Sequence, residues 1–387
     1  MWKLVRKFVA LSMICFSLIG CLVIWITDDP TPGKGYHSKD YISRLLAQRP
    51  LLTSKCTRQL QLWTNAQIYG YSNEPFRFQC PGVPCEASIV ANTNLSTTKL
   101  SDGVVFFSDA EWGWDKMHSA RPHGQKWFFY SRESPTRTRP GVMPPMEYNS
   151  DSYDYTMTYR HDSDFPAGFG YYNETKHEIE ADDDQNWAAE KTNILIAPAA
   201  DCQPATWKRD SFIKELKEFV PVDLYGECTD PEYRPCEESV GCLEKLRFYK
   251  FSLALENSRC RDFITEKFFM SLASGTVPIV DGPRREDYER VGPPNSFIHV
   301  SDFGSVQELA DYIKLVDSND KLYNRFFDWK KRGNVVTVSV ADLFGTKNIC
   351  PIFQRMYDDE MKGASIDSAI KPKISDWEEW WQGSCSY

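Results

Sequence analysis

The sequence predicts an α/β protein with parallel sheets, built as two domains behind an N-terminal transmembrane helix. The chain has 387 residues, which is more than one hydrophobic core usually serves, so two domains of ordinary size are expected. Short apolar runs alternate with helical stretches from about Leu60 onward, as is typical of βαβ units. The run 8–26 near the N-terminus contains no charged residue. Together these observations indicate an anchored globular protein.

The run 8–26 is about as long as a helix needs to cross a bilayer. Cations precede it and aspartates follow it, so we expect a cytoplasmic tail at 1–7, an anchor at 8–26 and a lumenal stem at 27–60. A cleaved signal peptide is the alternative, but the run exceeds a usual signal-peptide core. Sequons for N-glycosylation at Asn94 and Asn173 agree with lumenal placement.

The cysteine count favours disulfides. Of 12 cysteines, Cys15 and Cys21 fall in the anchor, which leaves ten on the exported side, an even number in an oxidising compartment. Some of them are clustered, which raises zinc as an alternative, but no histidine stands at ligand spacing beside them. The clustered residues are Cys80, Cys85, Cys228, Cys236 and Cys242. The sequence leaves the pairing of the cysteines open.

The charge balance excludes one class of partner. The formal net charge is −9, and no run rich in Lys and Arg follows the first few residues, which argues against a nucleic-acid surface. An anionic ligand must therefore meet a local positive site.

Two groups of predicted strands give the domain boundaries. The polar segment 178–191 separates the groups and is the expected linker, so we place domains at 61–185 and 186–345, followed by a C-terminal segment 346–387. A helix predicted between the strands Asn193–Ala197 and Pro221–Tyr225 has apolar residues on one face. The strands are Gly103–Phe107, Trp127–Tyr130, Asn193–Ala197, Pro221–Tyr225, Tyr249–Leu255 and Thr276–Val280.

Charged residues separate the strand Tyr249–Leu255 from the predicted helix Phe263–Ser274, which Gly275 should end. They fall at the carboxyl end of a parallel strand and the amino end of a helix, where open α/β sheets bind ligands and where anions are favoured. Asp262 and Glu266 stand four residues apart, and like charges at that spacing repel in a helix unless a ligand or cation relieves them. The pattern favours a phosphate or sugar-phosphate site, with a solvated first helical turn as the alternative.

This region also carries a family resemblance. Tyr249-Lys-Phe-Ser-Leu-Ala-Leu-Glu-Asn-Ser258, together with Asp262-Phe-Ile-Thr-Glu-Lys267 and Val277-Pro-Ile-Val-Asp-Gly-Pro283, resembles the donor motif of the α1,3-fucosyltransferases, glycosyltransferase family 10. Glu133-Ser-Pro135 and Tyr159-Arg-His-Asp-Ser-Asp164 resemble family segments in the same order. The resemblance covers most of residues 100 to 283.

The resemblance implies the GT-B architecture, in which two Rossmann-like domains face each other across a cleft. The first domain, 61–185, would hold the acceptor and the second, 186–345, would hold GDP-fucose. The implied reaction moves L-fucose from GDP-β-L-fucose to the 3-hydroxyl of N-acetylglucosamine in glycoprotein glycans, with inversion. The implied location is the Golgi membrane, as a single-pass type II protein with a lumenal catalytic domain.

The resemblance also assigns roles to residues. Glu133 matches the family's catalytic base, and we expect it to be partly buried against aromatic side chains, because a solvated carboxylate would be a weak base. Arg209 and Lys267 match the cations that grip the diphosphate. Without the resemblance, Glu133 and Arg209 would be taken as solvated surface charges. The remaining donor-binding residues implied are Glu256, Asn257, Phe263 and Glu266, and the residues placed near the cleft are Tyr159, Arg160 and Asp164.

The implied donor site needs no metal for binding, because side chains neutralise the diphosphate, and stimulation by a divalent cation such as Mn²⁺ stays open. The acidic run 182–184 is taken as a linker. Phe263 stands where many relatives have Tyr, Ser252 replaces an aromatic residue, and Pro198-Ala-Ala200 replaces a Ser-Asn pair, which affects donor affinity more than fold. The alternatives are a glycan-binding Golgi protein with a degenerate donor site and a transferase that uses another acceptor, such as a protein hydroxyl, or another sugar nucleotide.

Overall fold

The computed structural model describes residues 56–64, 71–108, 110, 112–139, 141–175, 185–199, 205–226, 232, 234–235, 243–363, 374 and 376–385. The predicted anchor at 8–26, most of the predicted stem and the acidic run 182–184 lie outside these residues. Within the described part of the chain, none of the helices has the length and apolar character needed to span a bilayer.

The first sheet has six strands in the order β2-β3-β1-β4-β5-β6, all parallel except for β2, which runs antiparallel to β3. The predicted strands at Gly103–Phe107 and Trp127–Tyr130 are confirmed as β4 and β5. The strands of this sheet are β1 (Thr57–Trp63), β2 (Phe76–Gln79), β3 (Glu86–Ala91), β4 (Gly103–Phe107), β5 (Lys126–Ser131) and β6 (Tyr155–Thr158).

Alternating side chains of these strands fill cores on the two faces of the first sheet. Val105 and Phe107 of β4 belong to one core, and Val104 and Phe106 belong to the other. This alternation is the period of two that a strand imposes, here with both faces apolar because both are covered. Short helices lie in the connections: α3 (Leu95–Thr98), α4 (Trp114–Ala120), η1 (Pro135–Arg137) and η2 (Met146–Asp151).

The second sheet has five parallel strands in the order β12-β11-β10-β8-β9. All four strands predicted for this region are confirmed, within two residues at each end. The strands are β8 (Asn193–Ala199), β9 (Val222–Gly226), β10 (Tyr249–Leu255), β11 (Val277–Asp281) and β12 (Ile298–His299). Their helices are α5 (Arg209–Leu216), α6 (Leu243–Leu246), α7 (Glu266–Ala273), α8 (Arg285–Val291), α9 (Val306–Asp317) and α10 (Asp320–Asn324), with the short turns η3 (Val300–Asp302) and η4 (Arg325–Lys331).

The chain crosses between the two sheets twice. On the way out it forms β7 (Gly170–Glu174), and on the way back it forms β13 (Gly333–Thr337), and these two strands pair antiparallel. After β13 the chain forms α11 (Val340–Leu343), α12 (Thr346–Gly363), α13 (Trp377–Trp381) and η5 (Gln382–Cys385).

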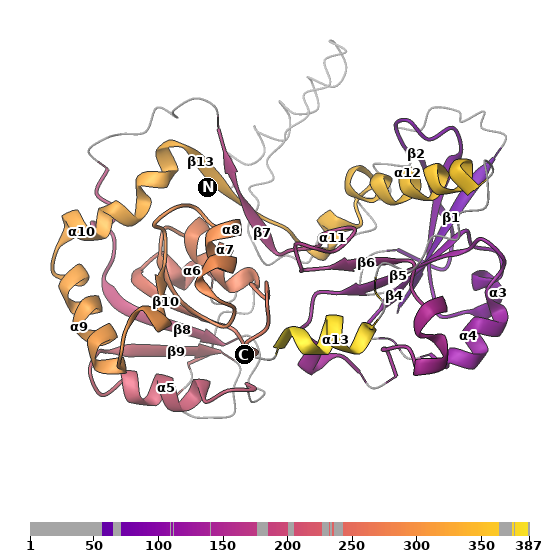
Figure 1. Ribbon diagram of the computed structural model, residues 1–387. Helices are drawn as coiled ribbons and strands as arrows, with labels where there is room; N and C mark the ends of the chain where they lie inside the picture. Colours follow the sequence, from indigo (N-terminus) through magenta and orange to yellow (C-terminus); the bar gives the residue numbers. More distant parts are fainter. Residues whose placement is uncertain are drawn as a thin grey trace, which may run out of the picture. The chain divides into compact units, whose positions relative to one another are not determined.

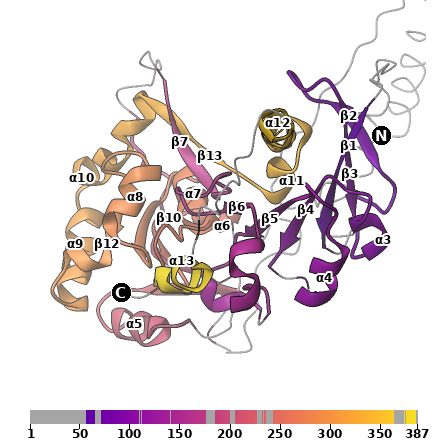
Figure 2. The same ribbon diagram turned by 45° about the vertical axis from the view of Figure 1, so that its right-hand side comes forward.

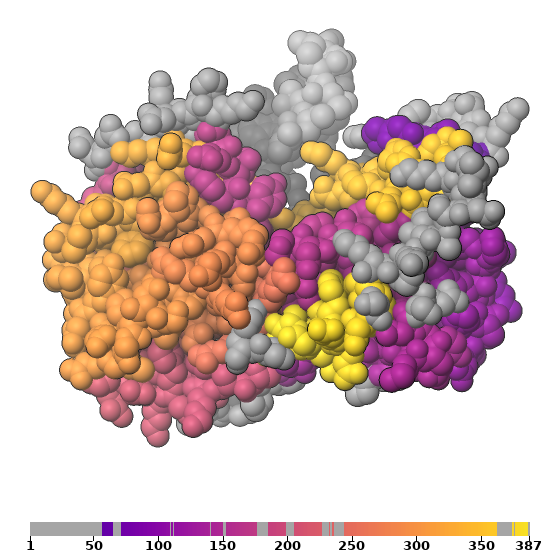
Figure 3. All heavy atoms as spheres, in the orientation of Figure 1, coloured from indigo at the N-terminus to yellow at the C-terminus, as the bar shows by residue number. Residues whose placement is uncertain are grey.

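The C-terminal helices cover the first sheet and not the second (Figures 1 and 2). Ile352 and Phe353 of α12 are buried in one core of the first sheet, and Trp377 and Trp381 of α13 are buried in the other. Figure 3 shows the same relationship from outside, with the yellow atoms of the C-terminal residues lying against magenta atoms of the first half of the chain. We call the first sheet with its helices, including α11 to η5, the first lobe, and residues from 185 to β13 the second lobe.

Disulfides join distant parts of the chain, as the cysteine count predicts. Cys80 and Cys85 do not bond to each other: Cys85 pairs with Cys56, and Cys80 pairs with Cys350 of α12. A further bond joins Cys260, in the loop after β10, to the C-terminal η5 through Cys385. Cys15, Cys21, Cys202, Cys228, Cys236 and Cys242 lie outside the described residues.

Candidate active site

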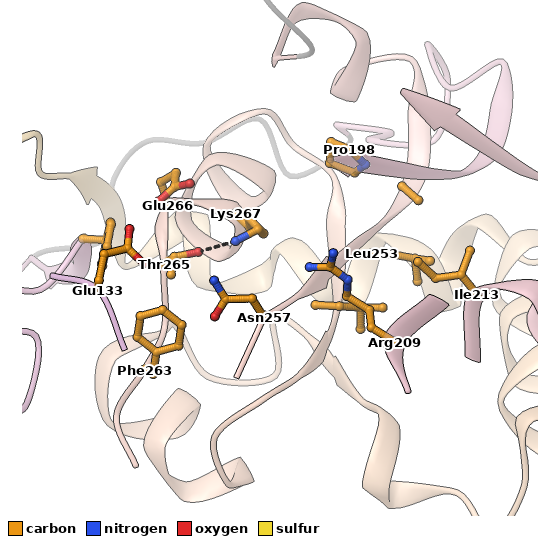
Figure 4. Close-up of a pocket in the computed structure, with 13 residues that line it drawn as sticks. Glu133, Pro198, Arg209, Ile213, Leu253, Asn257, Phe263, Thr265, Glu266 and Lys267 are labelled. Atoms are coloured by element: carbon orange, nitrogen blue, oxygen red, sulfur yellow. Dashed lines mark hydrogen bonds between the residues drawn. The ribbon is translucent and has the colours of Figure 1, made fainter. Parts of the chain in front are cut away.

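A cavity of about 210 Å³ lies at the carboxyl ends of β8 and β10 and is lined by residues from both lobes. Figure 4 shows the nitrogen atoms of Arg209, Asn257 and Lys267 facing one common space. Six of the residues named from the sequence line this cavity: Glu133, Arg209, Asn257, Phe263, Glu266 and Lys267. The cavity therefore brings residues together from segments that are more than 100 positions apart in the sequence.

Helix starts place the charged groups of the second lobe. Arg209 is the first residue of α5, and Glu266 and Lys267 open α7. Asn257 follows the carboxyl end of β10. Because helix amino ends carry unpaired N–H groups and a partial positive charge, two helix starts beside two cations favour an anion in the cavity.

The structure corrects the predicted start of α7, which begins at Glu266 after Thr265 as its N-cap residue, and not at Phe263. Asp262 has a left-handed backbone with φ of 63° and lies outside the helix, so the predicted helical repulsion between Asp262 and Glu266 is wrong. The carboxylate of Asp262 instead accepts hydrogen bonds from Arg290 at 2.5 Å and contacts Nδ1 of His161 at 2.6 Å. The predicted end of the helix is confirmed at Gly275, whose φ is 67°.

Lys267 is held by a buried network. Its Nζ lies 3.2 Å from Oε2 of Glu256 and 3.0 Å from Oγ1 of Thr265, and the Thr265 N–H donates to Glu256 Oε1 at 2.8 Å. Glu256 has no exposed surface and does not line the cavity. Its place is behind Lys267, where it positions the ammonium group and does not reach a ligand itself.

Burial and pairing shift the pKa values of this pair. Complete burial raises the pKa of the Glu256 carboxyl, although Lys267 and the Thr265 N–H oppose the rise. Burial on its own would lower the pKa of Lys267, but the carboxylates of Glu256 and Glu266 outweigh it and hold that pKa above its usual value. Lys267 is therefore a cation at neutral pH.

Glu133 follows β5 and is exposed at the cavity, which corrects the predicted partial burial against aromatic residues. The residues on either side of it take the buried positions. Arg132 donates to the carbonyl oxygens of Gly168 at 3.2 Å and Val338 at 2.7 Å, and the hydroxyl of Ser134 lies 2.9 Å from that of Ser258. The backbone around Glu133 is fixed while its side chain faces the open cavity.

The residues predicted near the cleft have structural contacts. Tyr159 is buried with its ring 5.0 Å from that of Phe263, so it supports a residue that lines the cavity. Arg160 donates to both carboxylate oxygens of Asp162, at 2.8 and 2.7 Å, and Asp164 accepts from the N–H of Thr156 at 2.9 Å. None of the three predicted cleft residues lines the cavity.

The departures from the family pattern fall at different depths. Phe263 and Pro198 line the cavity, so the side chains at these two positions would face a ligand there. Ser252 is fully buried and its hydroxyl donates to Ser271 at 2.7 Å, away from the cavity. The change at Ser252 is accommodated within the second lobe.

Some residues of the site were missed from the sequence. Thr265 lines the cavity, and its position just before a helix is the N-cap signal that would have found it. Phe169 lines the cavity beneath Arg132, whose guanidinium lies 3.9 Å from its ring, and no local pattern indicates it. Among the described residues no cluster of three or more His, Cys, Asp or Glu side chains is arranged to hold a metal ion.

Family models match both halves of the chain. The model described as "Glycosyltransferase family 10 (fucosyltransferase) C-term" matches residues 188–377, and the one described as "Fucosyltransferase, N-terminal" matches residues 56–170. The chain belongs to glycosyltransferase family 10. Both matched regions of this fucosyltransferase-family protein contribute residues to the cavity.

Curated relatives of this family member carry fucosyltransferase names. Glycoprotein 3-alpha-L-fucosyltransferase A of Drosophila melanogaster is 32% identical over 314 residues, which cover 79% of this chain and 56% of the relative. The mouse (Mus musculus) 4-galactosyl-N-acetylglucosaminide 3-alpha-L-fucosyltransferase 9 is 29% identical over 336 residues, which cover 85% of this chain and 87% of the relative. The chain thus spans little more than half of the first relative and most of the second.

Solved structures of an alpha1,3-fucosyltransferase share the fold. One has a TM-score of 0.50 at 16% identity, with 81% of this chain and 93% of the other covered. A second, with GDP, has a TM-score of 0.50 at 16% identity, with 86% and 98% covered. The family member described here therefore has the α/β fold with parallel sheets of those enzymes.

Proposed function

We propose that this protein transfers L-fucose from GDP-β-L-fucose to the 3-hydroxyl of N-acetylglucosamine in glycoprotein glycans, with inversion at the transferred carbon. The observation that carries the proposal is that Glu133 of the first lobe lines the same cavity as Arg209 and Lys267 of the second. A base and two cations are the groups that such a displacement requires. The names of the two relatives support the reaction class, and they differ in acceptor.

The second lobe would bind the donor in GT-B manner, at the carboxyl edge of its sheet. Arg209 offers a planar fork for two phosphate oxygens, and Lys267 offers a compact charge beside it. Glu266 would accept hydrogen bonds from fucose hydroxyls, and Asn257 would contact the nucleotide. Since the two side-chain cations neutralise the diphosphate, donor binding needs no divalent cation, and calorimetry with GDP in EDTA and in Mn²⁺ tests this.

The first lobe would supply the base. The Glu133 carboxylate takes the proton of the acceptor 3-hydroxyl as that oxygen bonds to the anomeric carbon from the face opposite the phosphate. The bond from that carbon to the phosphate oxygen breaks, and GDP leaves with the electron pair, stabilised by Arg209 and Lys267. The transition state has oxocarbenium character, as in glycoside hydrolysis. An acceptor seated over the exposed Glu133 would itself exclude water from the carboxylate.

Incubation of the full-length protein in detergent with GDP-fucose and a panel of glycans tests the proposal. We expect a product with one added fucose linked α1,3 to N-acetylglucosamine, assigned by mass spectrometry and linkage analysis. Glu133→Gln should lower transfer about 10²- to 10⁴-fold, the usual contribution of general-base catalysis, and should spare GDP binding. Glu147→Gln is the matched control, because Glu147 is exposed on η2 in the same lobe.

Two outcomes would overturn the proposal. If Glu133→Gln transferred fucose at the normal rate, Glu133 would not be the catalytic base. Absence of any calorimetric heat with GDP-fucose, together with retained glycan binding, would instead favour a glycan-binding protein with a degenerate donor site. Product formation on a protein hydroxyl in place of a glycan would keep the donor chemistry and change the acceptor.

We also propose a Golgi membrane location, with the described residues in the lumen. Asn94 and Asn173 are both exposed, so each sequon is accessible to a glycan. Expression in a eukaryotic host should give N-glycans at both, seen as a gel shift after glycosidase treatment that Asn94→Gln and Asn173→Gln each reduce. An unglycosylated protein would contradict lumenal placement.

A further inference from the structure

Three hydroxyl groups from the two lobes meet beside the cavity. Ser134 and Thr136 lie on the segment after β5, and Ser258 lies on the loop after β10. The oxygen atoms of Ser134 and Ser258 are 2.9 Å apart, those of Thr136 and Ser258 are 2.7 Å apart, and those of Ser134 and Thr136 are 2.8 Å apart. Ser134 and Ser258 have no exposed surface. We call these three residues the hydroxyl cluster.

The hydroxyl cluster lies between the two chemical halves of the site. On the first-lobe side, Ser134 is adjacent to Glu133, the proposed base. On the second-lobe side, Ser258 is adjacent to Asn257 and donates to its Oδ1 at 2.9 Å. Since that oxygen is occupied, the amide nitrogen of Asn257 is the atom turned toward Lys267 in the cavity (Figure 4). One hydroxyl thus contacts both the donor-side amide and the base-side segment.

Glu133 is fixed on its other side as well. Arg132 donates to Gly168 and Val338, which flank the crossing strands β7 and β13. The hydroxyl of Ser131 donates to the Glu133 carbonyl oxygen at 3.0 Å. The backbone of Glu133 is therefore tied to its own lobe and to the crossing strands, and the hydroxyl cluster joins this segment directly to the donor-binding loop at 257–258.

We propose that the hydroxyl cluster is a positioning element that sets the distance from the Glu133 carboxylate to the donor. This inference rests on the proposed transferase function. Displacement needs the acceptor oxygen, the anomeric carbon and the leaving phosphate oxygen in line, with the base within reach of the acceptor proton, and a misplacement of about 1 Å costs about 10²-fold in rate. Because the base and the donor are held by different lobes, a direct contact between the lobes at this point fixes the alignment.

The cluster contains redundant contacts. Ser134, Thr136 and Ser258 supply three hydroxyl hydrogens for four contacts, counting the one to Asn257. If either Ser134 or Thr136 loses its hydroxyl, the other still joins the first lobe to Ser258. The hydroxyl contact between this segment of the first lobe and Ser258 is lost only when both hydroxyls are removed, and the bond from Ser258 to Asn257 then remains.

Steady-state kinetics on the full-length protein test this inference. Ser134→Ala and Thr136→Val should each lower kcat less than about threefold, in the range of one replaceable hydrogen bond. The double variant Ser134→Ala/Thr136→Val should lower kcat about 10- to 100-fold, more than the product of the single effects, with the Kd for GDP unchanged. Ser134→Ala/Thr136→Ser restores one hydroxyl and should recover the kcat of Ser134→Ala alone.

Controls separate positioning from folding and from the proposed function. Ser252→Ala removes another fully buried hydroxyl, bonded to Ser271 within the second lobe, and should leave kcat unchanged. If the unaltered protein transfers no fucose, the proposed function fails. If it does transfer fucose and the double variant keeps a kcat within threefold, or loses GDP affinity as much as kcat, the positioning role is refuted.

Discussion

The ammonium group of Lys267 lies 3.2 Å from the carboxylate of Glu256, which has no exposed surface, while the Lys267 side chain is 19% exposed. The pair thus has one member facing the cavity and one sealed behind it. Removing one partner of a buried pair leaves the other charge uncompensated, and the effect on stability is far larger than for a surface pair.

Lys267→Met should lower the free energy of unfolding by about 3 to 5 kcal/mol at pH 7, because Glu256 is left buried and unpaired. Chemical denaturation measures the loss. Lys217→Met is the matched control, since Lys217 pairs with Glu232 at 2.6 Å on the surface and should cost at most about 1 kcal/mol. The double variant Lys267→Met/Glu256→Gln removes both charges and should recover much of the loss. A double variant less stable than Lys267→Met would show that charge is not the cause.

The same pair predicts a pH dependence. Burial raises the pKa of Glu256 above its unfolded value of about 4.3, so the folded state favours the protonated carboxyl. The stability that this group contributes is therefore fully present below about pH 4.3 and is lost as the pH rises through the folded pKa. Lys267→Met should raise that pKa further. The difference in Tm between the unaltered protein and Lys267→Met should therefore be small near pH 4.5 and grow toward pH 7. A difference independent of pH across this range would contradict the prediction.

Arg209→Ala should raise the Kd for GDP and lower kcat about 10²- to 10³-fold, the usual effect of losing one preorganised donor at a developing charge. Arg209→Lys should restore little of this, because an ammonium group cannot bind two phosphate oxygens as a guanidinium does. Guanosine, which has no phosphate, should bind the unaltered protein and both variants equally in calorimetry. Equal weakening of guanosine and GDP would place Arg209 against the nucleoside and not the diphosphate.

The disulfides should differ in their contribution to stability. Cys80 and Cys350 are 270 positions apart, and Cys56 and Cys85 are 29 apart. Loop-closure entropy predicts that opening the longer loop costs about 2 kcal/mol more in unfolding free energy. Urea denaturation of Cys80→Ser/Cys350→Ser and Cys56→Ser/Cys85→Ser compares them. A larger loss for the shorter loop would mean that native contacts, and not loop length, decide the effect.

Much of the second lobe was predictable because a parallel strand buried on both faces is a continuous apolar run, as in β10. The donor-side residues followed from that strand, since its carboxyl end fixes where a ligand binds. The start of α7 was not predictable from the same pattern. Thr265 and the left-handed Asp262 decide it, and both depend on partners elsewhere: Glu256 for Thr265, and Arg290 for Asp262.

Contacts between distant segments account for the other differences. The sequence of α12 has an apolar face, which indicates that the helix packs against other parts of the protein. It does not indicate that the helix covers the first sheet. Ser134 and Ser258 are 124 positions apart, and neither local sequence indicates the other. We predicted that Glu133 would be partly buried because a buried carboxylate is a stronger base, but the structure exposes it. Its two neighbours, Arg132 and Ser134, are buried instead, because each has a hydrogen-bond partner in a distant segment.

The return of α12 and α13 to the first lobe affects the order in which the two lobes complete their cores during synthesis. The second lobe is one uninterrupted stretch, so it has all of its core residues while α12 is still untranslated. The first lobe begins earlier but waits for Phe353 and Trp381. At about 5 to 20 residues per second, the Cys80 thiol waits roughly 15 to 50 s for Cys350, a separation of 270 residues. The half of the protein that is synthesised first is therefore completed last.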